Sequence, residues 1–142
     1  MSRVQLALNV SNVDEAVEFY RRLFATEPAK RRPGYANFAI ADPPLKLMLI
    51  EGAGEPGTLN HVGVEVESSG EVATEAARLR REGYDMVRED GVTCCYAVQD
   101  KFWVTGPDSR AWEVYTVLAD APQQTCAAAV SSPRGCFSEP TT

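Results

Sequence analysis

The chain has 142 residues, of which 44% are hydrophobic, with a formal net charge of −6 and a pI near 4.8. This length and apolar content predict one compact domain with its own core. The acidic balance argues against nucleic acid as a partner. The sequence has neither the ~18-residue apolar run of a membrane span nor the apolar region of a signal peptide. Four cysteines, two of them adjacent, do not form a disulfide framework, so we expect a reducing, cytoplasmic setting.

One pattern occurs twice in the chain, weakly, at an offset of 56 residues. Each half opens with polar and apolar residues in alternation, which predicts a strand; these are residues 5–10 and 61–66. A helical stripe follows behind Ser, Asn or Gly residues suited to a helix N-cap; the stripes span 13–24 and 72–79. Short strand signals then follow at 35–40, 46–51, 84–89, 101–105 and 112–117. We therefore expect two units of strand, helix and two or three strands, packed together.

The periodic pattern stops after Leu118. Residues 119–142 are rich in Ala, Ser, Pro, Thr and Gln, which predicts a mobile tail. Cys126 and Cys136 lie in this segment, and we interpret them as incidental thiols. A role in capturing soft ions and passing them inward is the alternative.

Cys94 and Cys95 are neighbours in the chain. A disulfide between neighbours needs a strained backbone, so the pair is a poor structural bridge. Two thiolates instead form a soft chelate, which suits Cd(II) or trivalent arsenic. On a regular strand the two side chains would point to opposite faces, so one shared atom requires a backbone that departs from strand geometry. The alternative is two small, partly buried apolar residues.

Three polar residues are candidates for a metal site. Alternation places Gln5 and His61 on the strand faces that do not meet a helix, and Glu113 can join them from the last strand. One imidazole, one carboxylate and one amide oxygen suit Fe(II), Mn(II) or Ni(II) and leave positions open for other ligands. The alternative is a core histidine and a solvated carboxylate. His61 is the chain's only histidine, so any imidazole chemistry must use it.

Several segments resemble one family; they are residues 3–8, 32–40, 43–47, 59–66, 93–107 and 112–115. They resemble the vicinal oxygen chelate superfamily, which includes glyoxalase I, extradiol dioxygenases and bleomycin-resistance proteins. Within it, the chain is similar to the branch of cadmium-induced CadI proteins and ArsI-type carbon–arsenic lyases. The resemblance covers about residues 1–118, and the run from Cys94 to Lys101 is its most specific part. It implies an α+β fold in which two paired βαβββ modules, about 1–55 and 58–118, form a concave mixed sheet around a metal site.

The resemblance also implies roles for individual residues. Gln5, His61 and Glu113 match the positions expected to bind Fe(II), and Cys94 and Cys95 match the pair expected to hold the arsenic of the substrate. No further catalytic residue is implied. Glutamine at the first metal position departs from the histidine that is usual in the superfamily.

The expected activity is an Fe(II)- and O₂-dependent, dioxygenase-type cleavage of the carbon–arsenic bond. The substrates would be trivalent organoarsenicals such as methylarsonous acid and reduced aromatic arsenicals, and the product arsenite, in a detoxification role. We expect a monomer or homodimer without nucleic acid or membrane partners. Two alternatives stay open: a cadmium or soft-metal binding protein without catalysis, and another glyoxalase- or extradiol-type dioxygenase.

Overall fold

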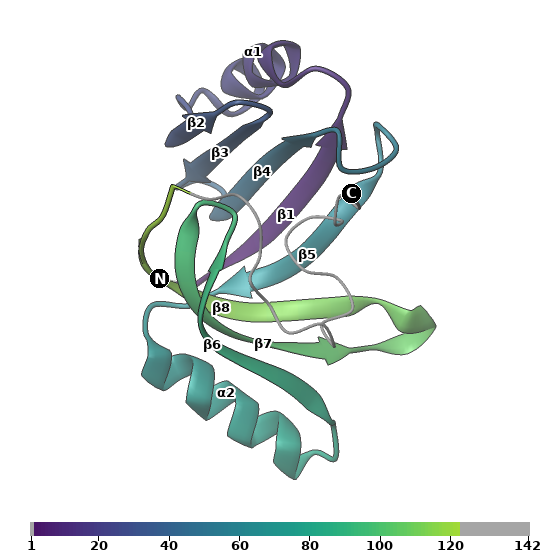
Figure 1. Ribbon diagram of the computed structural model, residues 1–142, viewed down its shortest axis with the longest axis vertical. Coiled ribbons are helices and arrows are strands. Elements are labelled where there is room, and N and C mark those ends of the chain that lie inside the picture. The colour runs from purple at the N-terminus through teal and green to yellow at the C-terminus, as the bar shows by residue number, and fades with distance from the viewer. Residues whose placement is uncertain (1, 123–142) are drawn as a thin grey trace.

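The structure is a computed structural model that describes residues 2–122. Each half contains a strand, a helix and three further strands (Figure 1). The first half comprises β1 (Arg3–Val10), α1 (Val13–Phe24), β2 (Lys30–Arg32), β3 (Tyr35–Ile40) and β4 (Leu45–Glu51). The second comprises β5 (Leu59–Glu65), α2 (Ser69–Arg81), β6 (Met86–Cys94), β7 (Ala97–Thr105), the short 3₁₀ turn η1 (Pro107–Ser109) and β8 (Ala111–Asp120).

All eight strands form one curled, mixed sheet in the order β2-β3-β4-β1-β5-β8-β7-β6. The halves join in the middle, where β1 and β5 pair antiparallel. Within each half the first strand pairs in parallel with the last one, β1 with β4 and β5 with β8. The two helices lie at opposite ends of the sheet (Figure 1). The strands at the centre of the sheet are therefore β1, β5 and β8, which carry the three candidate metal ligands.

Both helices begin at the predicted caps. The Asn12 side chain accepts a hydrogen bond from the Glu15 backbone N–H at 2.9 Å, and Ser68 does the same for Glu71 at 3.1 Å. These bonds satisfy backbone donors that the first helical turn leaves unpaired. The predicted stripes face the sheet, with Val13 and Val17 buried in α1 and Val72 and Ala76 in α2.

Alternation along the central strands separates an apolar face from a polar one. On β1, Leu6 and Leu8 pack in the cluster beneath α1. Gln5, Ala7 and Asn9 are buried on the other face. Val64 and Val66 likewise belong to the cluster beneath α2. The side of the sheet away from the helices is therefore an interior lined partly by polar groups.

The structure differs from the sequence prediction mainly at the strands of the β6–β7 hairpin. These were expected at 84–89 and 101–105, but β6 continues to Cys94 and β7 begins at Ala97. Gly91 and the register shift between Glu89 and Val92 interrupt the alternation of polar and apolar residues that predicts a strand. Strand β2 was also not predicted, because three residues are too few to show a period.

At the C-terminal end, β8 runs to Asp120, two residues beyond Leu118, the expected end of the domain. The rest of the expected tail, from residue 123 on, and with it Cys126 and Cys136, lies outside the described residues. Within residues 2–122, neither helix is long and apolar enough to cross a membrane.

Candidate functional site

Gln5, Gly63 and Glu113 form a row across the three central strands. Gln5 is paired with Gly63, and Gly63 with Glu113. A Cβ at Gly63 would lie 2.6 Å from Glu113 Cγ, which is too close for any side chain there. Because the middle position carries no side chain, the two outer residues meet above it, and Gln5 Nε2 donates a hydrogen bond to Glu113 Oε2 at 2.6 Å.

His61 joins this pair from β5, two residues before Gly63 and on the same face. Its Nε2 atom lies 3.2 Å from Glu113 Oε2. All three side chains are almost fully buried, with 0–2% of their surface exposed. The structure thus brings the three predicted metal ligands together at one point, while their role as ligands stays a prediction.

The donor chemistry at this point suits a cation. His61 Nδ1 lies 2.8 Å from Asn60 Oδ1, so Nδ1 carries the ring proton and Nε2 carries a lone pair. Nε2 makes no hydrogen bond to any residue in the described range 2–122 although it is fully buried, and it faces a carboxylate oxygen. Two electron-rich atoms that face each other without a proton between them are stabilised by a bound cation.

A rotation of the Gln5 amide by 180° would turn its carbonyl oxygen, in place of its N–H, toward the same point. No group of three His, Cys, Asp or Glu side chains in residues 2–122 is arranged to hold a metal. The set therefore depends on glutamine for its third donor, and this one-imidazole, one-carboxylate, one-amide combination fits a divalent cation that accepts mixed N and O ligands.

Lys101 supports Glu113 from the neighbouring strand β7. Lys101 Nζ donates to Glu113 Oε1 at 2.8 Å, and the ammonium also lies 5.6 Å from the centre of the Trp103 ring. Burial alone would raise the pKa of Glu113, but neighbouring charge, first of all that of Lys101, outweighs it and lowers the pKa. Glu113 is therefore ionised, with Oε1 held by Lys101 and Oε2 directed toward His61.

From the sequence, the default role of Lys101 is solvation or packing, with assistance in charge handling as the alternative. The available signal was its position on β7, where Gln99, Lys101 and Trp103 alternate onto the face opposite Phe102. A lysine in a strand that also contains Gln99 and Asp100 is a weak signal, because most strand lysines are solvated.

The vicinal cysteines lie at the tip of the β6–β7 hairpin. Cys94 pairs with Ala97, so Cys95 and Tyr96 form a two-residue turn. Both have left-handed backbone conformations, with φ of 56° and 64°. Turns of this kind favour Asn and Gly at these positions. The departure from strand geometry brings the two sulfurs within 3.6 Å of each other, which is the arrangement that a shared soft atom requires.

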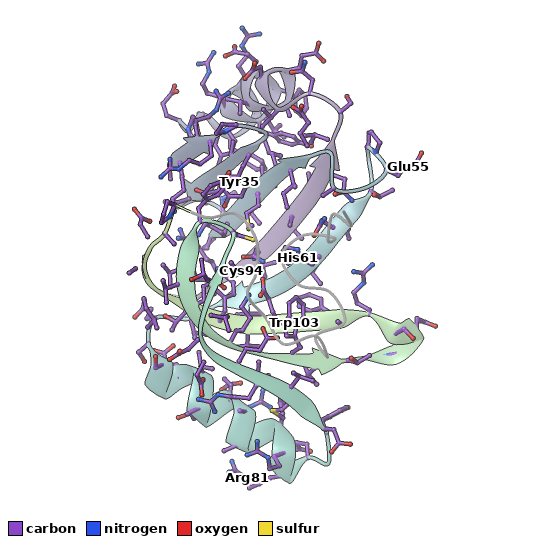
Figure 2. All side chains as sticks on the ribbon, viewed as in Figure 1. Tyr35, Glu55, His61, Arg81, Cys94 and Trp103 are labelled. Atoms are coloured by element: carbon purple, nitrogen blue, oxygen red, sulfur yellow. The ribbon has the colours of Figure 1, made fainter. Side chains whose placement is uncertain are left out.

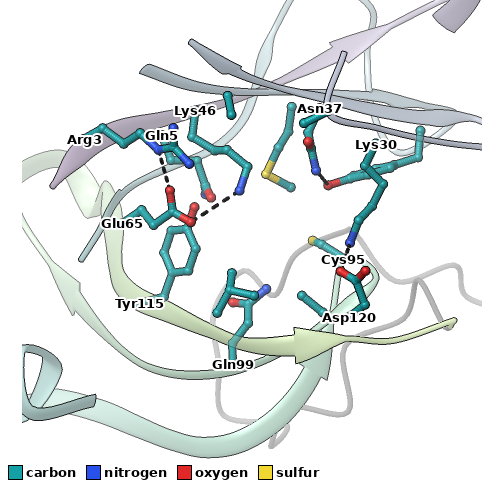
Figure 3. A pocket seen from close by; sticks show the side chains of 16 residues that line it. Arg3, Gln5, Lys30, Asn37, Lys46, Glu65, Cys95, Gln99, Tyr115 and Asp120 are labelled. Atoms are coloured by element: carbon teal, nitrogen blue, oxygen red, sulfur yellow. Dashed lines mark hydrogen bonds and ion pairs between the residues drawn. The ribbon is translucent and has the colours of Figure 1, made fainter. Parts of the chain in front are cut away.

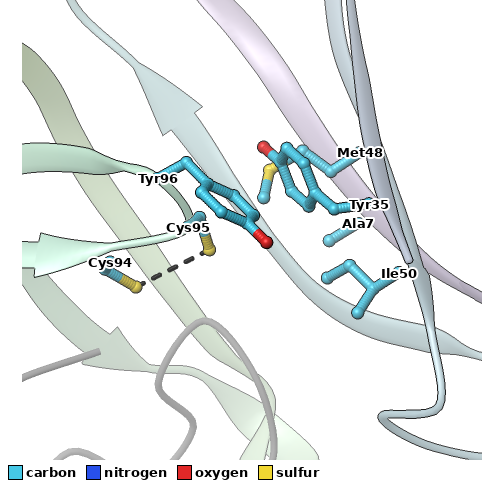
Figure 4. Packing of buried hydrophobic residues seen from close by; sticks show 7 residues of the cluster. All are labelled: Ala7, Tyr35, Met48, Ile50, Cys94, Cys95 and Tyr96. Atoms are coloured by element: carbon cyan, nitrogen blue, oxygen red, sulfur yellow. Dashed lines mark hydrogen bonds between the residues drawn. The ribbon is translucent and has the colours of Figure 1, made fainter. Parts of the chain in front are cut away.

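The tip packs onto the interior face of the first half. Cys94, Cys95 and Tyr96 form one buried cluster with residues of β1, β3 and β4, namely Ala7, Tyr35, Met48 and Ile50 (Figure 4). Ala7 is the direct pairing partner of His61, so the cluster borders the candidate metal centre. Figure 2 shows Cys94 and His61 in the same central region between the two halves.

Burial raises the pKa of the Cys95 thiol well above its usual value. Lys101 opposes this rise and Glu113 adds to it, which places Cys95 within electrostatic reach of the metal-site charges.

Several contacts hold the strained turn in place. The Tyr96 carbonyl accepts hydrogen bonds from Lys30 Nζ at 2.8 Å and from the Ala121 backbone N–H at 2.9 Å. Gln99 Nε2 donates to the Cys94 carbonyl at 2.9 Å, and the Arg32 guanidinium lies 5.5 Å from the centre of the Tyr96 ring. A strained conformation persists only when its surroundings over-determine it, and such strain is concentrated at functional sites.

A cavity of about 230 Å³ lies between the two halves (Figure 3). Gln5, Cys95 and Tyr115 line it, so it extends from one of the three candidate metal ligands to one of the two adjacent cysteines. Among the residues that the structure describes, the buried Tyr115 hydroxyl has no hydrogen-bond partner, and burial raises its pKa, so it remains a neutral donor. The volume is below the ~300 Å³ of a typical drug-sized pocket, so the cavity suits a small ligand.

Comparison with known proteins supports the fold assignment. The Glyoxalase/Bleomycin resistance protein/Dioxygenase superfamily matches residues 3–114. Among solved structures, the 2,3-dioxygenase LapB from Pseudomonas sp. KL28 superposes with a TM-score of 0.62 at 17% identity, over 92% of this chain and 46% of that one. At this identity the likeness concerns the fold alone.

Two curated relatives are much more similar. A cadmium-induced protein CadI from Mycobacterium tuberculosis is 65% identical over 121 residues, or 85% of this chain and 80% of that protein. A trivalent organoarsenical cleaving enzyme from Thermomonospora curvata is 62% identical over 122 residues, or 85% and 81%. The expected vicinal oxygen chelate fold is thereby confirmed, and the chain belongs to the Glyoxalase/Bleomycin resistance protein/Dioxygenase superfamily, in its branch of CadI proteins and organoarsenical-cleaving enzymes.

Proposed function

We propose that this protein cleaves the carbon–arsenic bond of small trivalent organoarsenicals in an Fe(II)- and O₂-dependent reaction and releases arsenite in the reducing cytoplasm. One observation carries the proposal: two sulfurs 3.6 Å apart share an interior with the Gln5–His61–Glu113 set. The name and 62% identity of the Thermomonospora curvata relative support it. All the proposed ligands come from one chain, so either a monomer or a homodimer could act.

The thiol pair would select and fix the arsenic. Cys94 is disulfide-bonded in the structure, so the exchange first requires its reduction, which the proposed reducing setting would supply. With both cysteines reduced, a trivalent organoarsenical with two hydroxyl groups would exchange both for the sulfurs of Cys94 and Cys95, and each thiol proton would leave with a hydroxyl as water. Burial raises the pKa of Cys95, and this exchange uses the neutral thiol without needing a separate base. Pentavalent arsenicals offer no such exchangeable positions, so the pair would exclude them.

The metal ligands would be His61 Nε2, Glu113 Oε2 and, after rotation of its amide, the Gln5 carbonyl oxygen. Fe(II) bound there would supply the redox chemistry with dioxygen that this cleavage requires. Lys101 keeps Glu113 ionised and fixes its orientation. Because Gln5 and Cys95 line one cavity, the arsenical and the metal would lie close together, and the two reactants would not have to meet in solution.

A second function is favoured by the 65% identity to a cadmium-induced protein. A protein that only sequesters soft metals would need Cys94 and Cys95 but not Gln5, His61 and Glu113 as a set. A glyoxalase- or extradiol-type enzyme would need the metal ligands but not the thiols. The two residue sets therefore separate the three possibilities.

The test starts from metal-free protein under anaerobic, reducing conditions. Fe(II), a trivalent methylarsenical and then O₂ are added, and arsenite is measured by chromatography with elemental detection. We expect release only when all three are present. His61→Ala should abolish release while arsenical binding persists, and Cys95→Ser should abolish both. Release from metal-free or oxygen-free protein would refute the proposal, and tight Cd(II) binding without release would favour sequestration.

A further inference from the structure

Next to His61, the pairing of β1 with β5 is irregular, because its register shifts by one residue. Ala7 of β1 pairs with His61, but the next residue, Leu8, pairs with Leu59. Asn60 is thus an extra residue, a β-bulge in β5. On a regular strand the side chains of Asn60 and His61 would point to opposite faces. The bulge instead brings Asn60 Oδ1 to 2.8 Å from His61 Nδ1.

Asn60 is itself held by a chain of hydrogen bonds. Asn60 Nδ2 donates to Asn9 Oδ1 at 3.0 Å, and Asn9 Nδ2 donates to Thr58 Oγ1 at 2.9 Å. The Thr58 hydroxyl donates to the Glu55 backbone carbonyl at 2.6 Å. We call Asn60, Asn9 and Thr58 the relay.

The end of the relay fixes its direction. The Glu55 carbonyl can only accept, so the Thr58 hydroxyl uses its proton there and must accept from Asn9. Asn9 then presents its oxygen to Asn60, and Asn60 presents its oxygen to His61. An oxygen at this place requires a proton on His61 Nδ1, which leaves Nε2 as the atom that bears the lone pair.

The loop 52–58 holds Asn9 firmly. The Asn9 backbone N–H donates to the Thr58 carbonyl at 2.9 Å, and the Asn9 backbone carbonyl accepts from the Gly57 N–H at 2.9 Å. The Asn9 side chain also occupies the space beside Gly54, where a Cβ would lie only 2.7 Å from Asn9 Nδ2. The mostly exposed loop 52–58 is thus tied to a fully buried histidine.

We propose that Asn60 is a positioning residue that sets the tautomer of His61, and that Asn9, Thr58 and Gly54 hold Asn60 in the orientation that does so. The proposal deepens the proposed function and rests on it in one respect, that His61 Nε2 binds a metal. Partners that orient a ligating histidine commonly contribute about 10- to 100-fold to metal affinity.

The tautomer can be measured directly, because His61 is the only histidine in the chain. Long-range ¹H–¹⁵N correlation spectra of tag-free, metal-free protein in alkaline buffer distinguish a protonated ring nitrogen from an unprotonated one. The wild type should show a protonated Nδ1 and an unprotonated Nε2. Asn60→Ala should shift the ring toward the Nε2–H form, whereas Asn60→Asp, which keeps an acceptor oxygen, should retain the wild-type tautomer.

Gly54→Ala tests the relay from the surface and avoids changing the buried asparagine. Its Cβ would displace the Asn9 side chain, so the His61 signals should move in the same direction as in Asn60→Ala. Gly106→Ala is the matched control, because a Cβ there lies 3.6 Å from the nearest atom, at ordinary contact distance. Gly106→Ala should leave the His61 signals unchanged.

Anaerobic Fe(II) titration adds a second readout. Asn60→Ala should weaken Fe(II) binding by about 10- to 100-fold, and Asn60→Asp should restore most of it. A wild-type Nε2–H tautomer, or unchanged His61 signals in both Asn60→Ala and Gly54→Ala, would overturn the proposal. Because the spectra need neither metal nor arsenical, this outcome is independent of whether the protein releases arsenite.

Discussion

Among single residues, Gln5 shows the largest difference between the orientation that a metal ligand needs and the orientation in the structure. Its amide nitrogen, not its oxygen, faces Glu113, and the hydrogen bond of 2.6 Å stabilises that orientation. A metal ligand would need the opposite orientation. The energy of this hydrogen bond opposes the rotation, whereas a cation between the carboxylate and the amide oxygen would reverse the preference.

Substitutions at Gln5 test whether it is a ligand. Gln5→Ala should weaken Fe(II) affinity by at least about tenfold and lower turnover, because one of three protein donors is lost. Gln5→His should retain or tighten Fe(II) binding, since imidazole is the stronger donor, while turnover can still fall. Anaerobic titration measures both. Unchanged affinity in Gln5→Ala would reduce the protein ligands to His61 and Glu113.

The pKa of Cys95 gives a pH prediction. Burial raises this pKa, so the thiol stays neutral through the neutral range and its thiolate fraction grows only in alkaline solution. Alkylation of Cys95, followed by peptide mass spectrometry, should therefore be slow at neutral pH and accelerate later than alkylation of glutathione as pH rises. Arsenical binding should depend little on pH over the same range, because it uses the neutral thiol. Parallel pH profiles for the two reactions would contradict this distinction.

At the scale of secondary-structure elements, the β6–β7 hairpin is the part that sequence reasoning described least well. From the sequence, two adjacent cysteines could share one atom only in an irregular backbone, and the backbone at Cys95 and Tyr96 is indeed a left-handed turn; the sharing of an atom stays a prediction. It could not show where the hairpin tip packs. That depends on Lys30 and Arg32 from a three-residue strand and on Ala121 beyond the expected end of the domain.

Lys30 offers a test of the hairpin tip. Its ammonium bonds both the Tyr96 carbonyl and Asp120, so Lys30→Met should loosen the turn. We expect about a tenfold loss of affinity for a trivalent arsenical, the equivalent of one charged hydrogen bond of about 1.5 kcal/mol. Fe(II) affinity should stay unchanged. Arg81→Met, at the exposed end of α2, is the control. Equal arsenical affinity in both variants would mean that Lys30 does not position the thiols.

At the scale of the whole molecule, the repeat of strand, helix and strands followed directly from sequence periodicity. So did the approach of Gln5, His61 and Glu113, because pairing of the halves places β1, β5 and β8 side by side. Periodicity could not predict which neighbouring residues contact the three candidate metal ligands. Gly63 had to leave space, Lys101 had to lie beneath Glu113, and a bulge had to turn Asn60 toward His61. Each depends on how neighbouring strands pair, and alternation within one strand does not encode that pairing.

Truncation tests where the functional domain ends. The sequence favoured a boundary at Leu118, but Asp120 bonds Lys30 and the Ala121 N–H bonds the Tyr96 carbonyl. Removal of residues 123–142, which include Cys126 and Cys136, should leave arsenite release under reducing conditions largely intact. A cut after Leu118 should instead lower arsenical affinity as Lys30→Met does, because two contacts to the hairpin region are lost.

Comparison of the two truncated proteins, with arsenite release and arsenical titration as readouts, separates the roles of the two segments. If both truncations retain full affinity, the end of β8 does not hold the thiol pair. If the cut after residue 122 is as damaging as Cys95→Ser, the segment with Cys126 and Cys136 belongs to the site. Iron titration of the same proteins supplies the internal standard, since His61, Glu113 and Lys101 all precede both cuts and should bind Fe(II) equally in each.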